Sequence, residues 1–328
     1  MTGATAWAVT FTAREKAEFL PVERDESSLG PTEIAGPTMA TLVSAGTELE
    51  GAYLGTQFPR TPGYAAIFRV EQTGNEVAGF PVGSLAYCMG PHRSFQRTTV
   101  DRALPVPAGL DPHDATFARL LGVSMSTLVT TTARPGDGVL VTGQGLVGHL
   151  AALVFARCGY SVVASDPSAV RREFSAGSGI RVLPAVPLGD PEFQDRTALV
   201  IECSGHEQAA LDGCRLVRKK GEVVLIGAPW RRRSDALAHD LLHAIFHRYV
   251  VLRSGWEWEL PLKETDFRSG AIFRNYSTAL RWLAEGAISV TPLYEAVKPE
   301  HAQQAFQDLL HVRTRRLAVV FDWRPWAG

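Results

Sequence analysis

Apolar positions recur in two different rhythms along the chain. In the first third, short apolar runs at residues 39–43, 65–70 and 84–88 lie between stretches rich in Gly, Pro and Thr. This pattern is typical of short strands in an irregular β domain. From residue 115 the spacing fits a helix instead, and the Arg-Pro-Gly-Asp stretch at residues 134–137 ends it. The change of rhythm predicts a domain boundary after residue 114.

The middle of the chain alternates strand-like and helix-like segments. Helices are predicted at residues 146–158 and 208–217, and Val-, Ile- and Leu-rich runs predict strands at residues 138–142, 161–165, 198–202 and 222–226. Because strands buried on both faces are apolar along their whole length, this alternation predicts a doubly wound parallel sheet with helices on both sides. We therefore expect an α/β protein with a β-rich domain over residues 1–114, an α/β domain over residues 115–260 and a C-terminal segment over residues 261–328.

Composition narrows the class of protein. Of the 328 residues, 45% are hydrophobic, and 33 Lys and Arg nearly balance 34 Asp and Glu. These values argue for a folded globular protein, against disorder and against a nucleic-acid partner. No segment has the apolar length of a membrane span, and the N-terminus does not resemble a signal peptide. Four cysteines without a CxxC pair fit a reducing compartment, so we expect a cytoplasmic protein with no membrane partner.

A glycine-rich turn joins the first predicted strand of the α/β domain to its first helix. Residues 138–148 read GVLVTGQGLVG and contain Gly143, Gly145 and Gly148. In a dinucleotide-binding turn, such glycines permit the tight turn, the close approach of a pyrophosphate and the packing of helix on strand. The helix N-terminus, at Leu146 and Val147, is then expected to face the phosphates. The alternative is an ordinary turn without a ligand.

The next predicted strand ends in Asp166, at the spacing expected of a carboxylate that binds the adenosine ribose. A carboxylate at this position repels a 2′-phosphate, which favours NAD over NADP. Arg171 and Arg172 follow closely, and arginines just beyond this strand also suit a 2′-phosphate. The alternative role for Asp166 is a helix cap ahead of Pro167.

At this point the sequence resembles the medium-chain dehydrogenase/reductase superfamily. The resemblance rests on the order and spacing of several segments, which are residues 44–55, 62–74, 80–92, 104–111, 135–148, 200–205 and 219–227. It implies a GroES-like catalytic domain, an inserted Rossmann domain, a C-terminal return to the first domain, and usually a homodimer. It also implies further cofactor contacts, at Arg171, Cys203, Ser204, Ile226, Gly227, Ala228 and Arg316. For Arg316, the alternative is a solvated position in a basic run.

The resemblance departs from the zinc-dependent members at the metal. The positions of their catalytic ligands are occupied here by Ala45, Tyr64 and, by a looser match, Val123, which leaves no nitrogen or sulfur donor set for zinc. The cysteines of a structural zinc lobe are also missing. We therefore expect no metal. His239, His243 and His247 recur every four residues, but they are expected to be structural or solvated.

Without a metal, interconversion of an alcohol and a ketone needs a proton donor or acceptor beside the developing alkoxide. The candidates are Tyr64, at the position of a zinc-ligand histidine, Thr47, Glu48 and His92. Each also has a structural alternative: Tyr64 as a packed aromatic, Thr47 and Glu48 as caps of a short helix, and His92 as an exposed loop residue.

The favoured function is a zinc-independent, NAD-dependent oxidoreductase that interconverts a secondary alcohol and a ketone on a polar, sugar- or cyclitol-like substrate. The alternative within the superfamily is an NADPH-dependent enoyl or quinone reductase that acts on a C=C bond. A hypothesis from another class is a catalytically silent nucleotide-binding subunit. Arg231, Arg232 and Arg233 are expected to face an anionic substrate or a dimer partner, and Trp256 and Trp258 to line an interface or a substrate wall.

Overall fold

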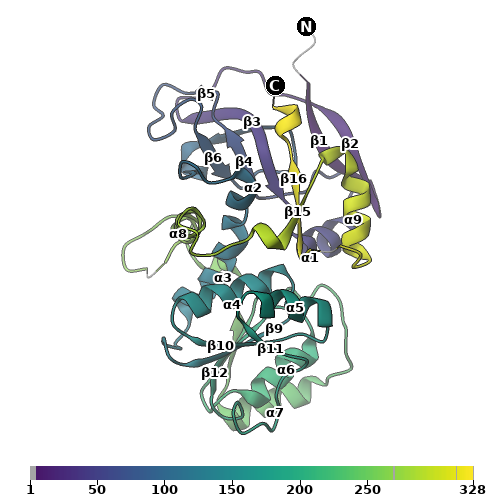
Figure 1. The fold of residues 1–328 in the computed structure, drawn as a ribbon, viewed down its shortest axis with the longest axis vertical. Coiled ribbons are helices and arrows are strands. Elements are labelled where there is room, and N and C mark those ends of the chain that lie inside the picture. The colour runs from purple at the N-terminus through teal and green to yellow at the C-terminus, as the bar shows by residue number, and fades with distance from the viewer. Residues whose placement is uncertain (1–4, 269, 315, 328) are drawn as a thin grey trace. The chain divides into compact units, whose positions relative to one another are not determined.

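The chain folds into two compact units. The computed structural model describes residues 5–268, 270–314 and 316–327 (Figure 1). We call residues 1–119 and 277–328 the terminal unit and residues 120–276 the central unit. The units thus divide after Arg119 and Tyr276, whereas the sequence patterns predicted divisions after residues 114 and 260.

The central unit is built on a parallel sheet, as the sequence predicts. Its strand order is β11-β10-β9-β12-β13-β14. The strands are β9 (Gly138–Thr142), β10 (Ser161–Ser165), β11 (Arg181–Leu183), β12 (Thr197–Glu202), β13 (Glu222–Leu225) and β14 (Val251–Ser254). Every residue of β12 is buried, as expected of a strand covered on both faces. The sequence did not predict the short edge strand β11, whose three residues carry too little pattern.

Helices cover both faces of this sheet (Figure 1). Those of the middle of the chain are α3 (Ala118–Thr130), α4 (Leu146–Arg157), α5 (Ala169–Gly177), α6 (Glu207–Leu216), α7 (Ala238–Arg248) and α8 (Ile272–Ala284). Leu211 and Leu216 of α6 and Ala244 of α7 join Leu140 and Val223 of the strands in one buried apolar cluster. Burial of this cluster holds the helices against the sheet.

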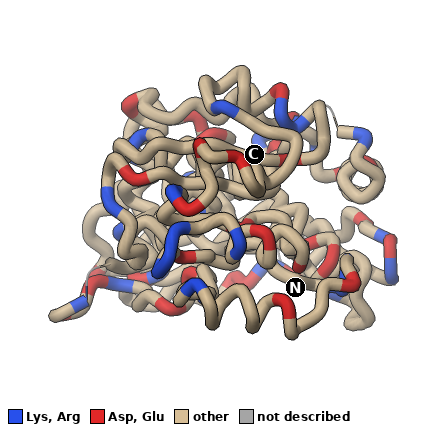
Figure 2. The backbone as a smooth tube through the Cα atoms, turned by 90° about the horizontal axis from the view of Figure 1, so that it is seen from below, with Lys and Arg blue, Asp and Glu red and all other residues tan. Residues whose placement is uncertain are grey.

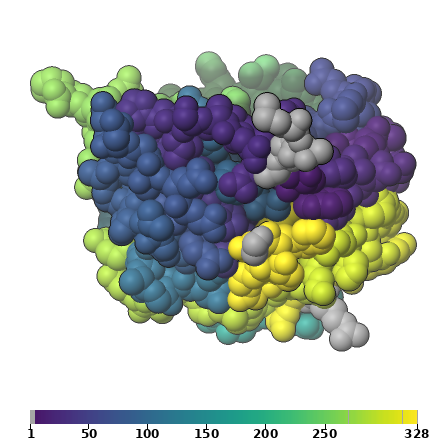
Figure 3. Space-filling model, turned by 90° about the horizontal axis from the view of Figure 1, so that it is seen from above, coloured from purple at the N-terminus to yellow at the C-terminus, as the bar shows by residue number. Residues whose placement is uncertain are grey.

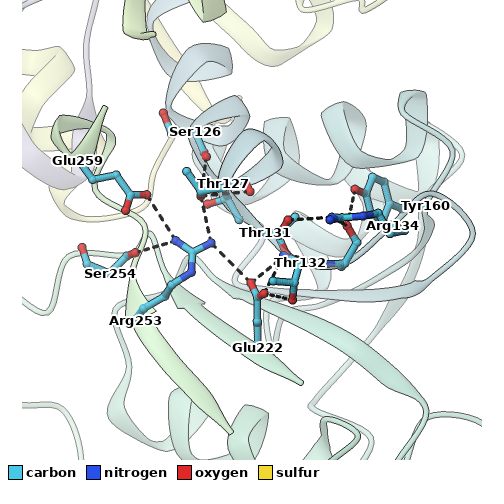
Figure 4. Close-up of polar contacts among 12 residues, drawn as sticks. Ser126, Thr127, Thr131, Thr132, Arg134, Tyr160, Glu222, Arg253, Ser254 and Glu259 are labelled. Carbon is cyan, nitrogen blue, oxygen red and sulfur yellow. Dashed lines mark hydrogen bonds and ion pairs between the residues drawn. The ribbon is translucent and has the colours of Figure 1, made fainter. Parts of the chain in front are cut away.

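A buried carboxylate ties the end of α3 to the edge of the sheet (Figure 4). Glu222, the first residue of β13, accepts hydrogen bonds from the Thr132 backbone N–H (2.7 Å) and the Thr131 hydroxyl (2.9 Å). The guanidinium of Arg253 on β14 lies 3.5 Å from Glu222 and donates to the Thr130 hydroxyl at 3.0 Å. Burial acts to raise the pKa of Glu222, but these hydrogen bonds and the Arg253 charge hold it below its usual value.

The terminal unit is a β-rich domain. An antiparallel pair, β1 (Thr5–Ala13) with β2 (Lys16–Glu23), stands beside a sheet of order β15-β16-β3-β4-β6-β8, in which β5 and β7 also pair with β3. The sheet strands are β3 (Glu33–Leu42), β4 (Ala66–Arg69), β5 (Gln72–Thr73), β6 (Leu85–Cys88), β7 (Phe95–Thr99), β8 (Ala103–Pro105), β15 (Tyr294–Val297) and β16 (Ala318–Asp322). The helices of this unit include α1 (Ala45–Glu48), α2 (Pro112–Ala115) and α9 (Ala302–Leu310).

The C-terminal segment completes this unit. Strand β16 pairs antiparallel with β3, with Val320 opposite Leu42. Phe11 of β1 packs edge-on against Phe306 of α9, with ring centroids 4.8 Å apart, in a cluster that also contains Trp323. Figure 3 shows the yellow C-terminal surface directly against the purple N-terminal surface. Helix α9, strand β16 and Trp323 therefore belong to the same core as strands β1 and β2.

The surface carries mixed charge. Figure 2 shows basic and acidic residues interspersed along the backbone rather than gathered by sign. This matches the near balance of basic and acidic residues in the sequence. Of the helices in the described ranges, none combines the length and the apolar character that a bilayer crossing requires.

Candidate functional site

The glycine-rich turn forms an open cradle at the N-terminus of α4 in the central unit. Gly143 follows β9 and has a φ of +80°, and a side chain there would lie 2.8 Å from the backbone of Ser204. A Cβ on Gly148 would lie 1.8 Å from the Gly143 carbonyl oxygen, whereas one on Gly145 would meet nothing within 4 Å. No side chain caps α4, which begins at Leu146. The turn is thus closed on its inner side and open at the helix N-terminus, as a pyrophosphate requires.

Asp166 is fixed beside this turn. It is buried, and its two carboxylate oxygens accept the backbone N–H groups of Gln144 (2.7 Å) and Ser168 (2.8 Å). A carboxylate has about four acceptor sites, so these two bonds do not use its whole hydrogen-bonding capacity. The half-exposed Arg171 guanidinium lies 3.7 Å away, whereas Arg172 donates to the carbonyl oxygen of Asp166 itself at 2.9 Å. Asp166 therefore both shapes the turn, through Gln144, and presents a carboxylate at it.

A buried series of hydrogen bonds, which the sequence did not reveal, supports the glycine-rich turn through Gln144. The Ser175 hydroxyl donates to Gln144 Oε1 at 2.8 Å, and His149 Nδ1 lies 3.0 Å from the same hydroxyl oxygen. Burial lowers the pKa of His149 to about 4, so the imidazole is neutral at physiological pH. Since the Ser175 proton is already used, Nδ1–H of His149 donates to Ser175. The only sequence signal was a polar residue inside an otherwise apolar helix.

The loops that follow strands β12 and β13 lie beside the glycine-rich turn, at the carboxyl ends of the parallel strands. Glu202, at the end of β12, accepts the N–H groups of Ser204 (2.7 Å) and Gly205 (3.0 Å), and its hydrogen-bonded partner Ser204 lies against Gly143. The Gly227 N–H donates to the Glu202 carbonyl oxygen at 2.8 Å. The structure thus brings together the predicted cofactor residues of three loops, which are Gly143, Gly145, Leu146, Val147, Gly148, Cys203, Ser204, Ile226, Gly227 and Ala228.

Arg316 lies in the terminal unit. Its guanidinium donates to the carbonyl oxygen of Pro292 at 2.7 Å. Its contact with a pyrophosphate stays a prediction. Cys203 carries no reactive thiolate, because burial raises the pKa of its thiol well above the usual value.

The candidate acid–base residues of the terminal unit include a buried pair, Glu48 and His92. His92 Nε2 lies 2.9 Å from Glu48 Oε2, and the other oxygen of Glu48 accepts the Ser44 N–H at 2.8 Å. Both side chains are almost fully buried, so the alternative of an exposed His92 is wrong. Glu48 also accepts the backbone N–H of Ser44 at the start of α1, so it has the helix-capping role given above as its structural alternative.

Two residues that the sequence did not single out extend this pair. His92 Nδ1 lies 2.7 Å from the Thr41 hydroxyl, and the Trp323 indole N–H donates to the same hydroxyl oxygen at 2.9 Å. The Glu48 carboxylate accepts the Nε2–H of His92, and the Thr41 hydroxyl is placed to donate to Nδ1. The order Trp323, Thr41, His92, Glu48 therefore forms one directed hydrogen-bond chain. Trp323 lies more than 230 residues from His92, so no local pattern connects them.

Tyr64 and Thr47 lie on the more accessible side of this chain. Tyr64 is partly buried, and Thr47 is exposed. Burial raises the pKa of the Tyr64 phenol, hydrogen bonds with Ser44 and Thr47 lower it in part, and the Glu48 carboxylate raises it. The guanidinium of Arg119 lies over the Tyr64 ring, 4.8 Å from its centroid. The site thus gathers a phenol, a hydroxyl, a carboxylate and a fixed cation.

The residues present do not fit a catalytic zinc ion. Ala45 and Tyr64 offer no nitrogen or sulfur ligand, and the nearby donors, Glu48 and His92, bind each other. Across the described ranges, no three or more His, Cys, Asp or Glu side chains converge as a metal site would. His239, His243 and His247 lie exposed on one face of α7, and Arg215 and Arg248 line the same small hollow as the last two.

Two sequence relatives of the chain are both dehydrogenases. The chain is 28% identical over 131 residues to a sorbitol dehydrogenase of Halalkalibacterium halodurans, covering 37% of this chain and 38% of that protein. It is 30% identical over 150 residues to an L-galactonate-5-dehydrogenase of Escherichia coli, covering 42% of each. The matched segment thus spans less than half the length of these relatives. No family model matches the chain.

Solved structures show the same fold over the whole chain. Galactitol-1-phosphate dehydrogenase of Escherichia coli superposes with a TM-score of 0.80 at 15% identity, covering 96% of this chain and 99% of that one. L-Idonate 5-dehydrogenase of Escherichia coli superposes with a TM-score of 0.78 at 15% identity, covering 97% and 98%. This fold and the two sequence relatives are consistent with the resemblance of the chain to the medium-chain dehydrogenase/reductase superfamily.

Proposed function

We propose that the protein is an NAD-dependent oxidoreductase that interconverts a secondary alcohol and a ketone on a polar, sugar- or cyclitol-like substrate without zinc. The observation that carries the proposal is the cradle at Gly145, with Asp166 fixed beside it. The relatives named for sorbitol and L-galactonate support a polyol-type substrate. Bound NAD supplies the hydride acceptor, and the chain supplies binding, orientation and proton transfer.

The central unit is proposed to hold the cofactor. The uncapped N-terminus of α4 binds the pyrophosphate, and the remaining acceptor capacity of the Asp166 carboxylate binds the adenosine ribose. The Asp166 charge disfavours a 2′-phosphate. The rest of the dinucleotide binds at the carboxyl ends of the parallel strands, where the loops at Ser204 and Gly227 lie beside the turn.

The terminal unit is proposed to supply the acid and base. The Tyr64 phenol donates a proton to the substrate oxygen during ketone reduction and accepts it during alcohol oxidation. Thr47 relays that proton to water from its exposed position. Glu48 and His92, which hydrogen-bond each other below the surface, hold Ser44 and the start of α1 in place beside Tyr64.

We further propose a cytoplasmic homodimer. Strand β14 is the last strand of its sheet among the residues that the structure describes, and apolar side chains stand exposed on and beside it. They are Phe246, Tyr249, Val251, Trp256 and Trp258. An edge of this kind is suited to pairing with a second copy and is an aggregation hazard when left bare.

The deciding experiment follows NADH formation by absorbance on a panel of polyols, sugar acids and aminocyclitols. NAD⁺ and NADP⁺ are compared, with and without a chelator, and the metal content of the purified enzyme is measured. Turnover with NAD⁺ that survives chelation on metal-free protein is expected. Loss of turnover on chelation, restored by zinc, would refute the metal-free proposal.

The C=C reductase remains the second candidate, because Arg171 stands close enough to Asp166 to meet a 2′-phosphate. It predicts NADPH consumption on enones or quinones and no oxidation of any polyol. A catalytically silent subunit predicts NADH binding, seen as quenching of tryptophan fluorescence, without turnover on either panel.

A further inference from the structure

Arg119 places a permanent positive charge inside the terminal unit. It is the second residue of α3, and only 5% of its surface is exposed. A guanidinium keeps its proton under all conditions in which a protein is folded. A buried charge acts strongly on the groups at its location, because little water screens it.

The location is the Tyr64 ring. The Cζ atom of Arg119 lies 4.8 Å from the ring centroid, within the range of a cation–π contact. The phenol on that ring faces the hydroxyls of Ser44 and Thr47 and the field of the Glu48 carboxylate. Glu48 is already matched by the N–H of Ser44 and by His92.

We propose that Arg119 is a positioning residue that acts through Tyr64 and makes its phenol a stronger acid. In this role it supplies the positive charge that a metal ion supplies at other alcohol and ketone sites. The inference rests on the proposed function of Tyr64 as the proton donor and acceptor. A cation near the ring stabilises the electron-rich phenolate more than the neutral phenol. It therefore opposes burial and the Glu48 carboxylate, both of which raise the pKa of Tyr64.

The same cation also orients the donor. A ring held under a guanidinium is restricted in the direction of its hydroxyl, and a fixed donor transfers a proton more effectively than a mobile one. Lysine carries the same charge but lacks the flat face that stacks on a ring. Charge and orientation can therefore be separated by substitution.

The test is a titration of the Tyr64 phenol, which needs no turnover. The seven tyrosines are labelled with carbon-13 at Cζ, and the Tyr64 signal is identified by its loss in Tyr64→Phe. Arg119→Gln is expected to raise the pKa of Tyr64, and Arg119→Lys to raise it by less. The matched control is Arg24→Met, which removes a guanidinium from over the ring of Phe95, 3.6 Å from its centroid. It should leave the Tyr64 signal and the activity unchanged.

The kinetic readout is the pH profile of alcohol oxidation. Arg119→Gln is expected to lower kcat by about tenfold to a hundredfold at neutral pH. It should also move the acidic limb of the profile to higher pH, with partial rescue in Arg119→Lys. If Arg119→Gln does not fold, the lysine variant alone still decides the matter, because it must shift the phenol. A Tyr64 signal that titrates identically in wild type, Arg119→Gln and Arg119→Lys overturns the inference. A shifted phenol in a protein that oxidises no alcohol upholds the contact and refutes only the proposed function.

Discussion

At the scale of single residues, the phenolic oxygen of Tyr64 separates a chemical role from a packing role. Tyr64→Phe keeps the ring under Arg119 and removes the hydroxyl, which is the only group of that side chain able to exchange a proton. We expect kcat to fall by about a hundredfold or more, because a positioned acid or base contributes that much. The melting temperature should change little. Steady-state NADH formation measures the effect, and Tyr160→Phe, which loses a phenol bonded to the Ala133 carbonyl in the other unit, is the control. Unchanged turnover in Tyr64→Phe would make Tyr64 a packed aromatic.

The buried Glu48–His92 pair is expected to act mainly on stability. His92→Ala leaves the Glu48 carboxylate buried with one lost partner and also opens a space beside Phe321, whose ring stands edge-on to His92 at 5.1 Å. A buried carboxylate that loses a hydrogen-bond donor costs about 1–3 kcal/mol of unfolding free energy or more. Urea denaturation should show a loss of this size. A loss below about 1 kcal/mol would mean that the pair is not coupled to the fold, since that is the range of an exposed pair.

Asp166 sets the cofactor preference. Asp166→Ser removes the negative charge beside the glycine-rich turn and leaves Arg171 unopposed. We expect the ratio of kcat/KM for NAD⁺ over NADP⁺ to fall by about tenfold, equivalent to about 1.4 kcal/mol. Arg171→Ala is the matched variant and should move the ratio the opposite way. A ratio that is the same in both variants and in the wild type would show that neither side chain contacts the ribose.

At the scale of elements, Glu222 joins α3 to strands β13 and β14 and makes the central unit sensitive to acid. Its folded-state pKa lies below the ordinary 4.5, so its contribution is full above that value and is lost as the pH falls through the folded-state pKa. Glu222→Gln is expected to lower the unfolding free energy by about 1–3 kcal/mol at neutral pH, and the difference from wild type should shrink in acid. Urea titrations at several pH values measure it. A difference that does not depend on pH would assign the effect to packing alone.

The elements also show how far sequence patterns reach. Strands β9, β10 and β12 lie within one residue of their predicted bounds, because each is a continuous apolar run closed by a turn signal. Strand β11 has three half-exposed or exposed residues and was not predicted, since three residues are too few to show a strand pattern. Helix α5 was also missed, because Arg171, Arg172 and Glu173 interrupt its apolar residues and the one buried residue, Ser175, is polar.

At the scale of the whole molecule, β14 is expected to join two copies. Light scattering should give twice the chain mass of 35.6 kDa. Val251→Lys places a charge on the exposed edge strand, which blocks pairing between edges, and should yield monomers. Val170→Lys is the control, because Val170 is equally exposed on α5, away from β14. A dimer that persists in Val251→Lys places the interface elsewhere.

The sequence alone determined the features that depend on residues close together in the chain. The parallel sheet, the glycine-rich turn and Asp166 follow from apolar runs and from glycine and acid spacing within about thirty residues, because backbone geometry imposes those intervals directly. The superfamily resemblance followed from the order of such segments and is confirmed by the relatives. The four acid–base candidates were named, but their grouping was not.

Only the tertiary structure decided which of these candidates lie together. It buried His92 and paired it with Glu48, joined both to Thr41 and Trp323, and set Arg119 over Tyr64. Strand β16 brings Trp323 to β3, and α3 brings Arg119 to Tyr64, from positions tens to hundreds of residues away. No sequence interval encodes such contacts, because their distances are set by how the sheet closes and how side chains fill the core. The charge and burial around Tyr64, and with them its chemistry, are therefore properties of the fold.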